Sequence, residues 1–221
     1  MHRRLFLGGL AAAAAAPLLP AFAALPVFAA LPVPASRQLL FDIKRNNKRV
    51  GAHRLRFEPI ADGLKVLVEV TMKIGIGPIT LFNYKHNATE LWHGAEWQSV
   101  EALTVQNGKR MAVTARRTPT GVTIDGPKGK FTAPVNTTAA THWNRAMLDG
   151  PFLNTQTGEV QQPRIARMGE SVIAARAGPI RVERFAMTGE VVLDTYYDAG
   201  PTWAGLKFKG PDGSAFTYER V

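Results

Sequence analysis

The sequence predicts a mostly all-β protein, built as a curved antiparallel sheet or an open barrel of hairpins with one short covering helix. Three observations predict this class. From Gln38 onward, short runs alternate apolar and polar residues; Asn, Gly, Asp and Pro separate these runs at intervals; and a single segment has helical spacing. Alternation with a period of two turns one row of side chains toward a core and the other toward water, which is typical of antiparallel sheet with one buried face.

The predicted strands each assign their own faces. Between Leu64 and Ile74 the even-numbered positions are all apolar, whereas the odd-numbered positions are polar except for Leu67. Inward residues of other strands are Leu39, Phe41, Ile43, Met111, Val113, Val122 and Ile124. The strongest turn signal is Asn107-Gly108, because Asn-Gly between alternating runs is typical of a two-residue hairpin. Further strands are expected near residues 181–187, 190–198, 204–209 and 215–220.

The one segment with helical spacing runs from Thr138 to Leu148. Ala139, Trp143, Ala146 and Met147 recur at that spacing, Asn136-Thr137 provides a cap, and Gly150-Pro151 provides a stop. We expect this helix to cover an open end or face of the sheet.

The leader, residues 1–35, has the parts of a secretory signal. Arg3-Arg4 stands directly before Leu5-Phe6-Leu7 and a long alanine-rich apolar run, a pattern that looks like a twin-arginine signal. Three places offer small residues near a cut: Ala21-Phe22-Ala23, Val27-Phe28-Ala29 and Val33-Pro34-Ala35. Glycines and prolines interrupt the apolar run, which favours cleavage over an uncleaved membrane anchor. The sequence therefore predicts export to the periplasm of one β-rich domain, residues 36–221.

Composition narrows the partners of that domain. Without the two leader arginines, 27 basic residues become 25, which against 17 acidic residues leaves a charge of +8. Many of the basic residues sit in or beside predicted turns: Lys44, Arg45, Lys48, Arg49, Lys109, Arg110, Lys128 and Lys130. In the periplasm such a surface favours an anionic membrane surface and makes nucleic acid an unexpected partner, although dispersed charge also simply keeps a surface soluble. The absence of cysteine excludes disulfides, thiol nucleophiles and cysteine-ligated metals.

Ionisable residues among aromatic ones mark the candidate site. Between Thr80 and Trp92 the face that carries Tyr84 and Trp92 also carries His86 and Glu90, and His53 is in register with apolar neighbours on its own strand. The predicted ligand-binding residues are His53, Tyr84, His86, Glu90, Trp92 and Trp143. The alternative is that these histidines are hydrogen-bonded core residues. The spacing of His53, His86 and Glu90 does not predict a metal site, and the sequence does not identify a cofactor.

Other histidines and acids are expected outside this patch. His93 and His142 are predicted on a turn and on the surface of the helix, respectively. Glu101 is predicted either in the patch or on an exposed strand edge.

Six short motifs carry a resemblance to a known family. They are Arg49-Val50-Gly51-Ala52-His53, Glu90-Leu91-Trp92, Asn107-Gly108, Trp143-Asn144, Thr155-Gln156-Thr157-Gly158 and Tyr196-Tyr197-Asp198. Together they resemble a family of exported proteobacterial proteins described only as a domain of unknown function. This resemblance implies no activity and supplies no catalytic residues. By a looser analogy, many hairpins with one helix are similar to the open β-barrel carriers of lipoproteins or lipids in the periplasm.

These observations lead to three hypotheses. The first is a periplasmic protein that binds or carries a hydrophobic or amphiphilic small molecule in an open barrel. The second is an enzyme that uses His86 and Glu90 as an acid and base pair on a lipid-like or isoprenoid substrate. The third is a structural envelope protein with neither cavity nor ligand. The chain contains no Gly-x-Ser-x-Gly elbow, phosphate-binding glycine loop or His-Glu-x-x-His helix, so no reaction is predicted from a motif.

Overall fold

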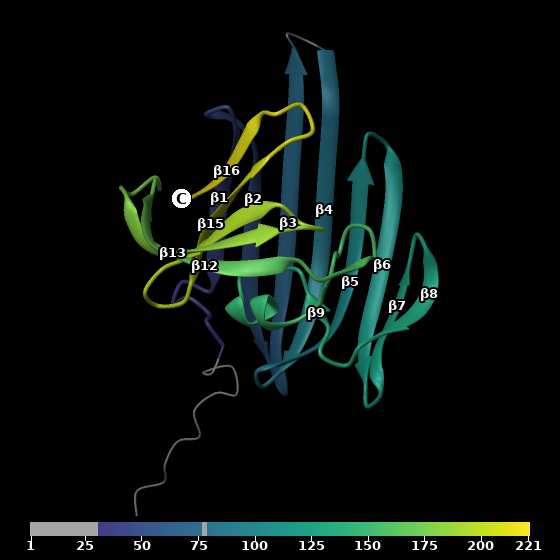
Figure 1. The fold of residues 1–221 in the computed structure, drawn as a ribbon. Helices are drawn as coiled ribbons and strands as arrows, with labels where there is room; N and C mark the ends of the chain where they lie inside the picture. The colour runs from purple at the N-terminus through teal and green to yellow at the C-terminus, as the bar shows by residue number, and fades with distance from the viewer. Residues whose placement is uncertain (1–30, 77–78) are drawn as a thin grey trace, which may run out of the picture.

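The computed structural model describes residues 31–76 and 79–221, so most of the predicted leader lies outside the described residues. One large curved antiparallel sheet dominates the molecule (Figure 1). Its thirteen strands lie in the order β12-β13-β14-β15-β16-β1-β2-β3-β4-β5-β6-β7-β8. The strand β16 near the end of the chain pairs with β1 along Phe41–Arg45, which joins the two halves of the sequence into one sheet.

Most of these strands are joined by short turns, as the sequence predicts. The sheet consists of β1 (Gln38–Arg45), β2 (Lys48–Ile60), β3 (Gly63–Ile76), β4 (Ile79–His93), β5 (Glu96–Gln106), β6 (Lys109–Thr118), β7 (Gly121–Gly126), β8 (Gly129–Ala133), β12 (Arg164–Ile173), β13 (Ile180–Thr188), β14 (Leu193–Tyr197), β15 (Trp203–Lys209) and β16 (Ala215–Arg220). A second sheet of three short strands contains β9 (Thr138–Ala139), β10 (Phe152–Leu153) and β11 (Val160–Gln161). The large sheet is not closed into a barrel, because β8 and β12 are its two edges.

The inner face of the sheet is the one that alternation predicts. Leu64 and Val66 are fully buried, and Val68 and Val70 are almost so, whereas Lys73 on the other face is exposed. On the other strands Leu39, Phe41, Ile43, Val113, Val122 and Ile124 are buried and Met111 is half-buried. The all-β class and the antiparallel sheet are confirmed.

The prediction of one short covering α-helix was wrong. Residues 134–163, which we call the cover segment, lie against the inner face and contain β9, β10, β11 and a 3-10 helix, η2 (Arg145–Asp149), in place of the predicted α-helix (Figure 1). Thr138–Ala139 instead pairs in parallel with Phe152–Leu153. His142 has φ 57°, which breaks a right-handed helix, and Asn144 caps η2 by accepting a hydrogen bond from the Ala146 amide at 3.0 Å.

The first described residues already contribute to the core. Leu31 is buried in the main hydrophobic cluster, and Val33 packs against it. A cut after Ala35 removes Leu31 from the core, whereas a cut after Ala23 or Ala29 leaves it in place. No helix within the described ranges is long and apolar enough to cross a membrane.

Candidate functional site

The strand register places the candidate residues in two parallel rows across the inner face. The first, the histidine row, consists of Phe41, His53, Val70, His86 and Thr104 on β1 to β5. The second, the glutamate row, consists of Phe57, Val66, Glu90 and Val100 on β2 to β5. His86 and Glu90 are four residues apart on β4, which separates the rows by about 13 Å.

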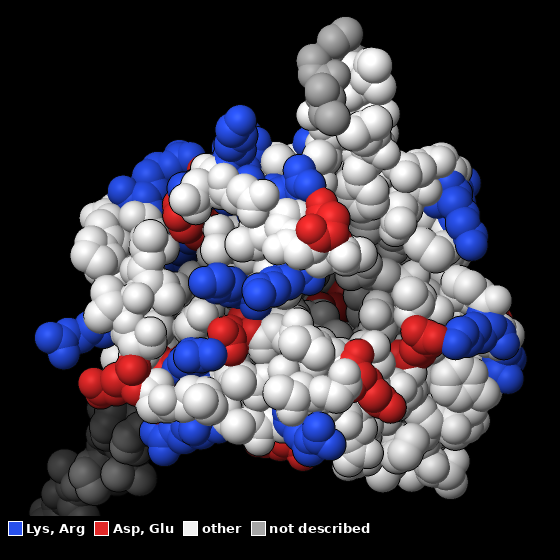
Figure 2. Space-filling model, turned by 45° about the horizontal axis from the view of Figure 1, so that its top comes forward, with Lys and Arg blue, Asp and Glu red and all other residues white. Residues whose placement is uncertain are grey.

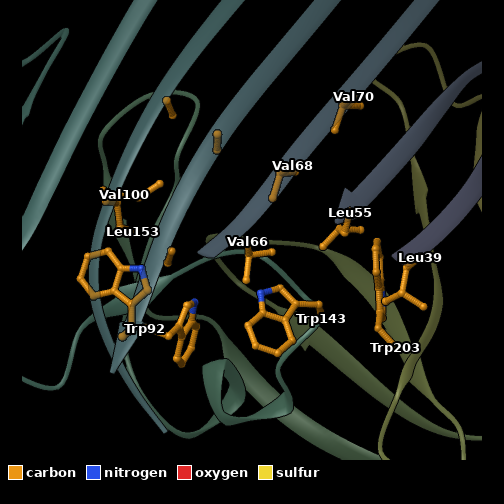
Figure 3. Packing of buried hydrophobic residues seen from close by; sticks show 14 of the residues in the cluster. Leu39, Leu55, Val66, Val68, Val70, Trp92, Val100, Trp143, Leu153 and Trp203 are labelled. Atoms are coloured by element: carbon orange, nitrogen blue, oxygen red, sulfur yellow. The ribbon is translucent and has the colours of Figure 1, made fainter. Parts of the chain in front are cut away.

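Glu90 is the most deeply buried acid of the site and is held by two indoles. Its Oε2 accepts hydrogen bonds from Nε1 of Trp92 at 2.9 Å and from Nε1 of Trp143 at 3.4 Å. The two indole rings are 5.1 Å apart and nearly perpendicular. Trp143 comes from the cover segment, so Glu90 joins the sheet to its cover. In Figure 3, Trp143 lies between Trp92 and Trp203 along the inner face.

The environment of Glu90 favours its neutral form. Complete burial raises the pKa of Glu90 to about 7, and the indole N–H groups and the Thr141 hydroxyl oppose this shift only in part. The second oxygen, Oε1, is enclosed and has no hydrogen-bond partner among the described residues. Glu90 is therefore a proton-binding group whose charge changes near neutral pH.

His86 is bonded to threonines and not to Glu90. Its Nδ1 is 2.9 Å from Oγ1 of Thr104, and its Nε2 is 3.3 Å from Oγ1 of Thr155 in the cover segment. Tyr84 is stacked at 6.5 Å from the imidazole. Burial lowers the pKa of His86 to about 4, so the imidazole is neutral at pH 7. The structure thus places His86 and Glu90 in separate contacts, without a direct acid and base pair.

His53 is enclosed by aromatic rings, and none of them forms a hydrogen bond with its imidazole nitrogens. The ring lies 5.2 Å from Trp203 and 5.7 Å from Tyr218, both in edge-to-face arrangements. Both ring nitrogens lack a hydrogen-bond partner among the described residues. Burial, with the charges of His142 and His86 as smaller causes, lowers the pKa of His53 to about 3.

The structure adds two residues to this part of the site, His142 and Trp203. The His142 ring is stacked on Trp203 at 5.5 Å, and its enclosed Nδ1 has no partner in the part of the chain that the structure describes. Desolvation lowers the pKa of His142 to about 4. The half-buried residue is stacked on Trp203 and precedes η2, so the prediction of a helix-surface residue was wrong. Tyr197 donates a hydrogen bond from its hydroxyl to the His142 carbonyl at 2.8 Å. The motif Tyr196-Tyr197-Asp198 could have indicated this part of the site, but no pattern in the sequence indicated Trp203.

The predicted site residues therefore form two clusters at one wall, the inner face of β1 to β5 and β15, which Trp143 and His142 contact from the cover segment. Glu90, Trp92 and Trp143 form the first, and His53 belongs to the second with Trp203 and His142. His86 and Tyr84 both lie on β4. His86 belongs to the histidine row, and Tyr84 lies two residues before it on the same face. His93 and Glu101 are exposed and belong to neither cluster. Within the described ranges, no group of three or more His, Asp or Glu side chains is arranged to hold a metal ion.

Side chains of the protein fill the space in front of this wall. Trp143 and Trp203 are completely buried and Trp92 is almost so. Two open surface hollows of the described residues lie elsewhere: one between β6 and β7 beside Asp125, and the other between β8 and β11 beside Phe131. A ligand can therefore reach the wall only if the cover segment moves.

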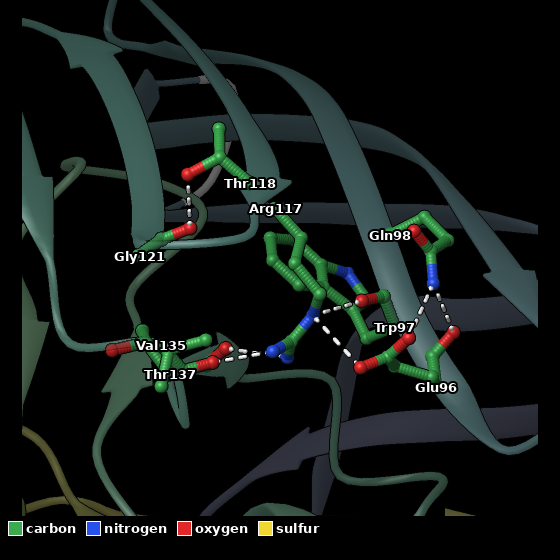
Figure 4. Close-up of polar contacts among 8 residues, drawn as sticks. All are labelled: Glu96, Trp97, Gln98, Arg117, Thr118, Gly121, Val135 and Thr137. Atoms are coloured by element: carbon green, nitrogen blue, oxygen red, sulfur yellow. Dashed lines mark hydrogen bonds and ion pairs between the residues drawn. The ribbon is translucent and has the colours of Figure 1, made fainter.

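The start of the cover segment is fixed by Arg117 of β6 (Figure 4). Its Nε donates to the Trp97 carbonyl at 2.7 Å, and its two terminal nitrogens donate to the carbonyls of Val135 and, at 3.2 Å, Thr137. Three backbone acceptors on two segments thus share one planar guanidinium, which suits the fork geometry of arginine. The contacts over the site are weaker, because the Trp143–Glu90 and Thr155–His86 bonds are long.

Fold and site together define a class: an all-β protein whose curved sheet encloses buried ionisable residues beneath an irregular cover. Residues 41–221 match the model of the family DUF6134, described as a domain of unknown function, and the chain belongs to that family. Comparisons with curated proteins and with solved structures gave no match.

Proposed function

We propose that this protein binds a hydrophobic or amphiphilic small molecule between the inner face of its sheet and the cover segment. The observation that carries the proposal is a set of enclosed polar atoms that no described residue satisfies. Of nine such atoms among the described residues, five lie at this site: both ring nitrogens of His53, Nδ1 of His142, Nε1 of Trp203 and Oε1 of Glu90. Each unsatisfied buried polar group costs about 1–3 kcal/mol. Several such groups on one wall favour a partner that supplies the missing hydrogen bonds.

The chemistry of these atoms favours an uncharged polar group on the ligand. Neutral His53 offers one donor and one acceptor, and the Trp203 indole offers a donor. A hydroxyl or carbonyl group matches that set. The apolar surface for the rest of the ligand comes from Trp143 and from Trp92 and Phe57, whose ring centroids each lie 5.1 Å from that of Trp143.

Quenching of tryptophan fluorescence tests the proposal. All four tryptophans are buried on or beside the wall, so the uncharged methyl ester of dibromostearic acid bound there should quench them in a saturable way. His53→Phe should weaken the apparent affinity about tenfold, as expected for the loss of one hydrogen bond. The matched control is His93→Phe, which changes an exposed histidine and should leave the affinity unchanged. No saturable quenching, or equal affinities in both variants, would refute the proposal.

The filled wall favours a second candidate, a structural role in the envelope. In that case the tryptophans pack permanently against the cover, and the protein needs no ligand. Mass spectrometry of the natively purified protein separates the two, because a carrier retains a stoichiometric small molecule and a structural protein does not. In a structural protein, ordered water molecules would supply the hydrogen bonds that the enclosed polar atoms lack.

A third candidate is an enzyme. The raised pKa of Glu90 supports catalysis by Glu90 alone better than catalysis by the predicted pair of His86 and Glu90. Since His86 is bonded to Thr104 and Thr155, Glu90 is the residue of the site best suited to transfer a proton near neutral pH. Loss of turnover in Glu90→Gln, with turnover retained in His86→Gln, would support catalysis by Glu90 alone on a lipid-like or isoprenoid substrate.

Export to the periplasm and likeness to lipid carriers are further parts of this proposal. Export is supported by the order of charged, apolar and small residues in the leader, and the likeness to lipid carriers is supported only by the open antiparallel sheet of hairpins. Replacement of both Arg3 and Arg4 by lysine tests the twin-arginine route. The expected result is accumulation of the uncleaved chain in the cytoplasm, and unchanged periplasmic protein would contradict it.

A further inference from the structure

One hairpin of the sheet projects beyond all its neighbours. Pairing of β2 with β3 begins at Gly51 opposite Met72, and on the other side the amide of Asn107 bonds to the carbonyl of Asn83 at 2.8 Å. Lys73–Ile76 of β3 and 79–82 of β4 therefore extend without a neighbouring strand on either side (Figure 1). Four residues of strand correspond to a projection of about 13 Å. We call this part the hairpin tip.

The hairpin tip is apolar on both of its faces. Ile79 is 63 % exposed and Leu81 is 56 % exposed, whereas Phe82 and Ile74 are half-buried on the inner face. Large apolar residues on both faces of a projecting ribbon are unfavourable in water. Exposed apolar clusters of this kind mark interaction sites.

The charged residues near the tip are basic. Lys73 and Lys85 lie on the outer face of the hairpin, and both are exposed. Their strand partners, Asn83 and Thr71, are uncharged. From residue 70 to residue 89 the chain contains these two lysines and no acidic residue.

Strand directions bring the other basic turns to the same end of the sheet. The β1–β2, β5–β6 and β7–β8 turns all face the end from which the hairpin tip projects, at staggered heights. They carry the eight basic residues that the sequence places in or beside turns: Lys44, Arg45, Lys48, Arg49, Lys109, Arg110, Lys128 and Lys130. Figure 2 shows lysine and arginine on both sides of the white column that the hairpin forms.

Several of these cations are free to meet an external anion. Lys44, Arg45, Arg49 and Lys128 form ion pairs with acidic side chains. Within residues 31–76 and 79–221, no ion pair engages Lys48, Lys73, Lys85, Lys109, Arg110 or Lys130, and all six are exposed. Of the turns at the opposite end, residues 61–62, 94–95 and 119–120 contain neither lysine nor arginine, and residues 174–179 contain only Arg176, which pairs with Asp42. Among the described residues, six exposed cations without an ion pair therefore lie around the tip, and others, such as Arg54, Arg56 and Arg116, lie farther from it.

We propose that this end of the sheet docks onto an anionic phospholipid bilayer, with Ile79 and Leu81 inserted and the surrounding lysines and arginines at the headgroups. The dimensions fit, since the headgroup layer on each side of a bilayer is about 5–8 Å thick and the tip projects about 13 Å. Apolar insertion flanked by basic residues is the combination that binds peripheral proteins to anionic lipid. The proposal does not depend on what the inner face binds.

The observations favour a bilayer over other occupants. A second copy of the chain would bring two basic ends together, which repel each other. Nucleic acid would be attracted by the basic turns but would leave the apolar tip exposed to water.

A single fluorescent label tests insertion directly. The chain contains no cysteine, so Ile79→Cys and Val172→Cys each give one site for the environment-sensitive dye NBD. Both positions are 63 % exposed, and Val172 lies on the edge strand β12, far from the tip in the sheet order. With the full chain and vesicles of phosphatidylglycerol and phosphatidylcholine, emission at position 79 should rise severalfold and be quenched by spin-labelled lipid. Emission at position 172 should not change.

The charge requirement is tested in the same labelled chain. Lys73→Glu with Lys85→Glu should lower the vesicle partition coefficient by about tenfold or more. Arg56→Glu with Arg116→Glu makes the same change in net charge with exposed residues farther from the tip, and should have a smaller effect. No rise at position 79, or an equal rise at positions 79 and 172, overturns the proposal. An equal rise with pure phosphatidylcholine overturns its anionic part, and a rise with protein concentration alone identifies a second copy instead.

Discussion

Replacement of Glu90 by glutamine should remove a pH dependence of stability that one buried proton causes. Burial raises the pKa of Glu90 from 4.5 to about 7, so the folded state holds this proton between those two pH values while the unfolded state loses it. Stability from Glu90 is therefore fully present below pH 4.5 and is lost as the pH rises to 7. At about 1.4 kcal/mol for each pH unit, the loss is about 3 kcal/mol. Glutamine has no proton to lose and similar shape.

The assay is urea unfolding of both proteins at closely spaced pH values from 4 to 8. Three histidines act in the opposite direction, because the lowered pKa values of His53, His86 and His142 make the protein lose stability as the pH falls below 6.5. Their contribution is the same in both proteins and cancels in the difference between the two free energies of unfolding. Between pH 4.5 and 7, the wild type should lose about 3 kcal/mol of unfolding free energy relative to Glu90→Gln. Below pH 4.5 and above pH 7, the difference between the two proteins should stay constant.

A level difference across the whole range would refute this reasoning. It would mean that water reaches Glu90 and keeps its pKa near 4.5, so that the cover segment does not seal the two indoles over the carboxyl group. A shift that favours the wild type with rising pH would indicate a cation near Glu90 in solution.

Three further changes test the packing around the site. His53→Phe should raise the free energy of unfolding at pH 7 by about 1–3 kcal/mol, since both unsatisfied nitrogens are removed, and should lower the pH of acid unfolding; urea and acid titrations check this. Arg117→Ala should cost about 2–3 kcal/mol in urea, because three carbonyls lose their donor, and Arg117→Lys should recover less than half. Gly51→Ala should cost about 3–4 kcal/mol, because its Cβ would lie 2.0 Å from the Thr71 carbonyl oxygen, whereas Gly108→Ala, in open space at φ +84°, should cost about 1 kcal/mol in the same assay.

The buried faces of the strands could be predicted from the sequence because each depends on the chain only locally. A strand turns alternate side chains to opposite sides whatever its neighbours are, so parity alone placed Tyr84, His86, Glu90 and Trp92 on the inner face. Their grouping depends on register, which parity does not determine. Four residues along one strand are about 13 Å, so a shared face did not mean a shared contact for His86 and Glu90.

The conformation of the cover segment could not be predicted from the sequence, because its apolar residues do not form one helix face but pack against different parts of the molecule. Trp143 contacts Trp92 and Phe57, and Met147 belongs to a separate cluster with Phe152 and Met187. Residues at helical spacing in the sequence thus meet different partners in space. Trp203 was missed for the related reason that β15 lies far along the chain from His53.

The inner face and the hairpin tip are joined by one continuous row of side chains on β4. Phe82 is stacked on Tyr84 at 6.1 Å and Tyr84 on His86 at 6.5 Å, so aromatic surface leads from the half-buried base of the tip to the buried histidine row. If both proposals hold, a molecule leaving the bilayer at the tip meets this row before it reaches His53 and Glu90. The two proposals still fail separately: Ile79→Asp should abolish transfer from vesicles but leave quenching by the dissolved methyl ester of dibromostearic acid intact, whereas His53→Phe should weaken the quenching and leave vesicle binding unchanged.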